Sequence, residues 1–124
     1  MVGGLSAINA VAGAYSEDLP LLVVSGGPNT NDGHDRKLVH HTIGEIELYQ
    51  SSKCFEPVVA KTFVIRHISD AARVIDGAIL TALTERKPVY LELPVNLSQL
   101  PVADPSTLCF LPSRKVSNIH FLSP

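Results

Sequence analysis

The chain has 124 residues, of which 45% are hydrophobic and 18% charged, with a mean hydropathy of +0.20 and a formal net charge of −2. This length and composition favour one globular domain with a buried core. The 10 Lys and Arg residues form no dense basic cluster, which argues against a nucleic-acid partner. No apolar run is long enough to cross a bilayer, and the high apolar content predicts surface reserved for a protein partner.

The two cysteines, Cys54 and Cys109, stand far apart and have no metal-like spacing. Isolated cysteines of this kind favour reduced thiols and a cytoplasmic protein. The small, apolar stretch at the N-terminus has no Lys or Arg before its apolar part, and its apolar residues recur with helical spacing. We therefore do not interpret it as a signal peptide.

In chain order, apolar residues at three- and four-residue steps first predict a helix over roughly 4–16. The continuous apolar run at 19–24 (LPLLVV) predicts a strand buried on both faces of a parallel sheet. A turn cluster at 25–29 (SGGPN) follows, and 29–35 continues as a polar loop. Because α/β proteins place ligands in loops at the carboxyl ends of parallel strands, this loop is a candidate site.

The remaining elements are a short helix at 44–55, a strand at 58–65, a strong helix at 70–86 capped by Ser69, and a strand at 88–93. On the last strand Val89, Leu91 and Leu93 share one face. The strong helix is expected to pack through one apolar stripe, formed by Ala71, Val74, Ile75, Ala78, Ile79, Ala82 and Leu83.

The order of these elements predicts an α/β fold with a mostly parallel sheet of about three strands and flanking helices. The chain opens on a helix that has no strand before it, so it is interpreted as the second half of a parallel-sheet domain. From Pro101 onward the sequence becomes Pro- and Ser-rich and aperiodic, which is typical of a linker or tail.

Common catalytic motifs are absent from the sequence. The glycines at 3–4 and 26–27 fit neither a dinucleotide-binding GxGxxG nor a phosphate loop, and Ser25 has no GxSxG nucleophile elbow. A metal site built from His34, Asp35 and the paired histidines His40 and His41 is conceivable. Adjacent histidines rarely converge on one ion, so no metal site is predicted.

His40 and His41 lie side by side in the stretch KLVHHTIG. In a loop both imidazoles can turn into one cavity, where each titrates near neutral pH and each resists the charging of the other. Two proton carriers beyond the carboxyl end of a strand indicate a catalytic role. The alternative is one packed and one exposed histidine without a function.

Short motifs run in a fixed order along the chain: VGGLSA at 2–7, GAY at 13–15, LP at 19–20, GPN at 27–29, ND at 31–32, HHTIG at 40–44, PVYL at 88–91 and Asn96. In order and spacing they resemble the pyruvate decarboxylase family of thiamine diphosphate-dependent 2-oxo acid decarboxylases, over residues 1 to about 101. The adjacent histidines separate these decarboxylases from most other thiamine diphosphate enzymes.

The resemblance implies a truncated N-terminal pyrimidine-binding domain over 1–101, followed by a linker at 102–124. It implies a carbon–carbon lyase of fermentation that converts pyruvate to acetaldehyde and carbon dioxide. His40 and His41 then form the catalytic dyad, with His41 the better candidate for substrate contact. Val2 and Gly3 match the segment beside the aminopyrimidine ring of the cofactor.

The resemblance also implies that thiamine diphosphate and magnesium are held by groups that this chain lacks, in a cytoplasmic dimer of dimers. The chain alone is therefore expected to be inactive. One alternative is a decarboxylase of indolepyruvate or of branched 2-oxo acids. Another is a non-catalytic module that only associates with full-length subunits.

Overall fold

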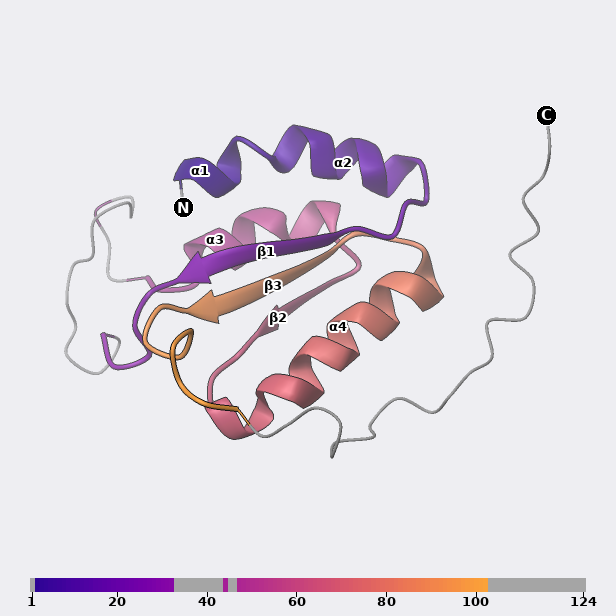
Figure 1. The fold of residues 1–124 in the computed structure, drawn as a ribbon. Helices are drawn as coiled ribbons and strands as arrows, with labels where there is room; N and C mark the ends of the chain where they lie inside the picture. The colour runs from indigo at the N-terminus through magenta and orange to yellow at the C-terminus, as the bar shows by residue number, and fades with distance from the viewer. Residues whose placement is uncertain (1, 33–43, 45–46, 103–124) are drawn as a thin grey trace.

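The computed structural model describes residues 2–32, 44 and 47–102. Three helices lie on one side of a small sheet and a longer helix lies on the other side (Figure 1). The predicted tail at 102–124 falls almost entirely outside the described residues. In chain order the elements are α1 (Val2–Leu5), α2 (Ile8–Ser16), β1 (Leu22–Gly27), α3 (Gln50–Phe55), η1 (Glu56–Val58), β2 (Lys61–Val64), η2 (Ile68–Asp70), α4 (Ala71–Glu85) and β3 (Val89–Pro94).

Within the described part of the chain the sheet has three strands in the order β1-β3-β2, and both pairings are parallel. The predicted α/β architecture with about three parallel strands is therefore confirmed. The neighbours β2 and β3 are joined by a crossover that contains α4, which is how parallel neighbours are connected, whereas β1 is followed in the chain by β2 and pairs with β3. None of the described helices is long and apolar enough to cross a bilayer.

The central strand β3 carries the core on both of its faces. Val89 and Leu91 pack with α4 on one side, as the predicted apolar face requires. Tyr90 points to the other side, where its ring stacks on Phe55 of α3 at 4.7 Å between centroids. Val89 and Tyr90 are both fully buried. Alternation along one strand thus ties the two helical layers together.

The first strand is shifted and more exposed than predicted. It begins at Leu22 rather than Leu19 and continues through Gly27, so part of the expected turn is strand. The prediction of burial on both faces is wrong, because Leu22 is 36% and Val24 59% exposed. The physical reason is position: within the described residues β1 lies at the sheet edge, with β3 as its single neighbour.

The predicted N-terminal helix is divided in two. A turn at Ser6 and Ala7 separates α1 from α2, and the Ala7 amide donates to the Gly4 carbonyl at 3.0 Å. Two successive glycines in the first turn disfavour a continuous helix. Gly4 also faces Phe55, where an added Cβ would lie 3.5 Å from the ring, so this turn is packed against α3.

The remaining helices and β2 are shorter than predicted. Helix α3 begins at Gln50 instead of 44, and η1 takes the start of the predicted strand 58–65. Ser69 is not the cap of α4, because it lies in η2 and Asp70 occupies the cap position without a side-chain hydrogen bond. Only part of the apolar stripe is buried: Ala78 and Ala82 face the sheet, whereas Ile79 and Leu83 are 37% and 60% exposed.

Candidate functional site

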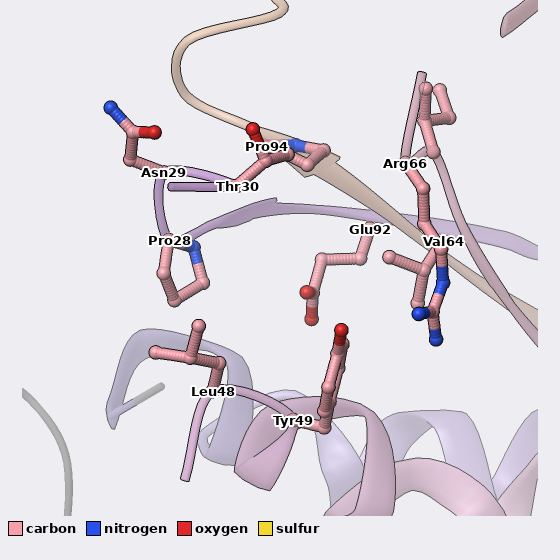
Figure 2. A pocket seen from close by; sticks show the side chains of 10 residues that line it. Pro28, Asn29, Thr30, Leu48, Tyr49, Val64, Arg66, Glu92 and Pro94 are labelled. Carbon is pink, nitrogen blue, oxygen red and sulfur yellow. The ribbon is translucent and has the colours of Figure 1, made fainter. Parts of the chain in front are cut away.

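A pocket opens at the carboxyl edge of the sheet, where all three strands end (Figure 2). This edge is where α/β sheets commonly bind ligands. The cavity measures about 80 Å³. Four stretches that are far apart in the sequence line it: Pro28, Asn29 and Thr30; Leu48 and Tyr49; Val64, Ile65 and Arg66; and Glu92 with Pro94.

Glu92 brings a carboxyl group into this pocket from the central strand. The residue is only 2% exposed, and in Figure 2 its side chain points into the space between Pro28, Val64 and Tyr49. Burial raises the pKa of the Glu92 carboxyl, and the hydrogen bond from Tyr90 partly opposes that rise. The pocket therefore contains a carboxyl group that keeps its proton to a higher pH than an exposed glutamate does.

Tyr90 links this carboxyl group to α3. Its hydroxyl oxygen lies 3.2 Å from Glu92 Oε2 and 3.0 Å from Ser51 Oγ. An ionised carboxylate only accepts hydrogen bonds, so in that state the phenol donates to Glu92 and Ser51 donates to the phenol. Burial is also the main cause that raises the pKa of the Tyr90 phenol. The three side chains form a polar cluster beside the apolar cluster of Val11, Phe55 and Val59.

Gly27, the last residue of β1, leaves the room that Glu92 occupies. A Cβ atom at Gly27 would lie 2.7 Å from Glu92 Cγ and 2.8 Å from Oε1. Carbon atoms in good contact are about 3.5–4.0 Å apart. The sequence suggested that this glycine belongs to a turn, whereas the structure shows that it makes space for a buried carboxyl group.

The loop after β1 is tied to the segment after β3 by a reciprocal pair of hydrogen bonds. The Thr30 amide donates to Asn96 Oδ1 at 3.1 Å, and Asn96 Nδ2 donates to Thr30 Oγ1 at 2.9 Å. Asn29 adds a local turn, because its Oδ1 accepts from the Asn31 amide at 2.9 Å. These bonds fix the direction of the chain as it leaves the pocket at Asp32.

Tyr49 closes the pocket opposite the loop. Its phenol points toward the same space as the Glu92 carboxyl group (Figure 2). The Arg66 guanidinium lies over the Tyr49 ring, 5.2 Å from its centroid, and such a cation–π contact supports the ring in this position. The pocket thus has two polar groups aimed inward and a cation stacked on its wall.

The predicted site residues are placed only in part. His40 and His41 lie outside the described residues, as do His34 and Asp35. Val2 and Gly3 lie in α1, where Gly3 is exposed and has nothing within 4 Å of an added Cβ. Within the described residues, no group of three or more His, Cys, Asp or Glu side chains could hold a metal ion.

Glu92 is the site residue that the sequence reasoning missed. The strand prediction placed Val89, Leu91 and Leu93 on one face and gave the opposite face no role. A carboxyl group inside the strand PVYLEL, with apolar residues on both sides of it, was the available signal. A buried carboxyl group in a cleft is a candidate functional residue.

Fold and pocket together define an α/β segment with a pocket at the edge formed by the carboxyl ends of its parallel strands. Comparison with known proteins identifies the segment. The chain is 49% identical over 100 residues to pyruvate decarboxylase 3 of Arabidopsis thaliana, a match that covers 81% of the chain. It is 48% identical over 100 residues to pyruvate decarboxylase 1 of Nicotiana tabacum. No protein-family model matches the chain.

Pyruvate decarboxylase 2 of Arabidopsis thaliana is 46% identical over 119 residues, a match that covers 94% of the chain. The chain is a pyruvate decarboxylase-like fragment, as its motifs predicted. It spans 17%, 24% and 20% of the length of these three relatives. Less than a quarter of each relative corresponds to this chain.

Proposed function

We propose that this chain contributes part of the active site of a thiamine diphosphate-dependent 2-oxo acid decarboxylase that converts pyruvate to acetaldehyde and carbon dioxide. One observation carries the proposal: nearly half of 100 aligned residues are identical to proteins named pyruvate decarboxylases. The parallel sheet with a pocket at its carboxyl edge supports it, because this is where α/β folds hold small ligands.

In this proposal His40 and His41 carry protons and His41 contacts the substrate. Loss of carbon dioxide leaves a carbanionic carbon that must be protonated, and imidazole exchanges protons near neutral pH. The support from the described residues concerns the part of the chain that comes just before the histidines. The bonds between Thr30 and Asn96 hold the chain at the pocket just before that segment begins.

The resemblance implies thiamine diphosphate and magnesium as cofactors. The described residues offer no group of metal ligands, so we derive no step through the metal or the diphosphate. The exposed position of Gly3 in α1, with open space where a side chain would be, supports the proposal that Val2 and Gly3 pack beside the pyrimidine ring. In the assembled enzyme the remaining cofactor contacts come from other parts of the polypeptide or from a partner subunit.

The proposed assembly is the dimer of dimers implied by the resemblance, in the cytoplasm. Exposed apolar side chains on β1, Leu22 at 36% and Val24 at 59%, support burial of this edge by protein outside the chain. The same observation favours the second candidate function, a non-catalytic module that associates with full-length subunits. Both candidates need the rest of the enzyme, and they differ in whether this segment supports turnover.

The test is a graft in which residues 1–101 replace the matched segment of pyruvate decarboxylase 3 from Arabidopsis thaliana. Acetaldehyde release is followed through a coupled alcohol dehydrogenase, with pyruvate, indolepyruvate and a branched 2-oxo acid as substrates. We expect turnover of pyruvate. A graft that folds and binds the cofactor but turns over none of the three supports the non-catalytic module. Preference for indolepyruvate or the branched acid supports the alternative decarboxylase.

A further inference from the structure

The pocket at the carboxyl edge combines two inward-facing polar groups with apolar walls. The polar groups are the Glu92 carboxyl and the Tyr49 phenol (Figure 2). We propose that this pocket binds a small uncharged molecule through a carbonyl group, which accepts a hydrogen bond from the carboxyl group of Glu92. The apolar part of the ligand then contacts the walls, which are formed by Pro28, Leu48, Val64, Ile65 and Pro94.

The size of the cavity limits the ligand. Its volume of about 80 Å³ is roughly half of the ~150 Å³ of a cavity that holds one benzene ring. A molecule of about three or four non-hydrogen atoms therefore fits. The rim is built before the ligand arrives, because the Asn96 side chain fixes Thr30 through two hydrogen bonds and Arg66 lies over the ring of Tyr49.

The charges around the pocket favour an uncharged ligand. The groups that face Glu92 are the Tyr90 phenol on its own strand, Ser51 of α3, Tyr49 before α3 and Arg66 after β2, while Gly27 of β1 brings no charge. A ligand ion of either sign would give up its water shell among the apolar walls, and the Arg66 guanidinium lies over the Tyr49 ring. Unpaired buried charges are costly.

The chemistry of the carboxyl group fits this ligand class. Burial raises the pKa of Glu92, which favours the protonated carboxyl group, and in that form the group can donate to a carbonyl oxygen. Its second oxygen can accept a hydrogen bond from a primary amide. The aldehyde that decarboxylation releases is also a small uncharged carbonyl compound; that connection rests on the proposed function, whereas the pocket chemistry does not.

The experiment measures binding of acetamide to the full chain, residues 1–124, by saturation-transfer NMR. Acetamide is an unreactive carbonyl compound of suitable size, and four non-hydrogen atoms limit the expected dissociation constant to about the millimolar range. Glu92→Gln keeps a donor and an acceptor and should retain binding. Glu92→Leu should weaken binding about tenfold. Glu85→Leu, on the exposed end of α4, is the matched control and should change nothing.

Several results would overturn the proposal. Equal affinity of Glu92→Leu and the unmodified chain would exclude the carboxyl group as the contact. Acetate has the same number of non-hydrogen atoms as acetamide, and equal binding of acetate would indicate an anion site at Arg66 instead. If Glu92→Leu does not fold, the binding site is located instead from the amide chemical-shift changes that acetamide causes in the unmodified chain. Changes confined to 28–30, 48–49, 64–66 and 92–94 support the pocket, whereas scattered or absent changes refute it.

Discussion

Gly27→Ala tests whether the Glu92 carboxyl group is packed as the structure shows. The new Cβ would lie 2.7 Å from Glu92 Cγ and 2.9 Å from Cδ, about 1 Å closer than carbon atoms in good contact. Glu92 cannot retreat freely, because Tyr90 holds Oε2 at 3.2 Å and β3 lies between two strands. Overpacking of this kind typically costs about 1–3 kcal/mol. Replacing glycine by alanine recovers about 0.4–1 kcal/mol through the unfolded state.

We therefore expect Gly27→Ala to lower the free energy of unfolding by about 1–2 kcal/mol. The assay is urea denaturation followed by far-UV circular dichroism, in an osmolyte such as sucrose that favours the folded state. Gly26→Ala is the matched control on the same strand, since nothing lies within 4 Å of its added Cβ. In a Glu92→Ala background the loss caused by Gly27→Ala should disappear.

Two results would refute this reasoning. The first is an equal loss of stability for Gly26→Ala and Gly27→Ala. It would show that the loss comes from strand propensity and not from the contact with Glu92. The second is an unchanged cost of Gly27→Ala when Glu92 is already alanine, since contacting residues should show a coupling energy of about 0.5–3 kcal/mol. Either outcome would place the Glu92 side chain elsewhere.

Three further predictions follow from the same residues. Burial raises the pKa of Glu92 above 4.5, so the unmodified chain loses stability as pH rises from that value to the folded-state pKa. In urea denaturation the stability of Glu92→Gln relative to the unmodified chain should therefore be higher at about pH 7 than at about pH 4. An equal difference between the two proteins at both pH values would contradict burial. Asn96→Ala removes both hydrogen bonds to Thr30 and should lower the free energy of unfolding by about 1–3 kcal/mol, measured by the same denaturation. Ser98→Ala, at an exposed residue after β3 that does not contact Thr30 through a hydrogen bond, is the control and should lower it less. The chain 1–124 alone should show no acetaldehyde release with thiamine diphosphate, magnesium and pyruvate, and turnover would count against this.

The architecture could be predicted because hydrophobic periodicity reports burial directly. The apolar positions of α4 and β3 recur with periods that only a helix and a strand produce, and the helices between strands require a parallel sheet. Boundaries were less certain because they depend on local bonds. The division of the first helix at Ser6 comes from two glycines and a contact with Phe55, which no period reveals.

Burial of β1 and the site around Glu92 could not be predicted for a different reason. An apolar run shows that a strand can be buried, but exposure depends on which neighbours the strand has, and β1 lies at the edge. Glu92 becomes notable only when Gly27, Tyr90 and Ser51 are brought around it by β1, β3 and α3. Such convergence is a property of tertiary structure.

The most direct test of the central claim measures turnover per bound cofactor in the grafted enzyme. His40→Ala and His41→Ala should each lower decarboxylation of pyruvate by about 10²–10⁴-fold while cofactor binding changes little, because general acid–base groups contribute that much. His67→Ala, at an exposed histidine before η2, is the matched control and should keep the full rate. If instead both variants lost the cofactor but kept the rate per bound cofactor, the two histidines would be structural and the proposed proton-carrying role would be wrong.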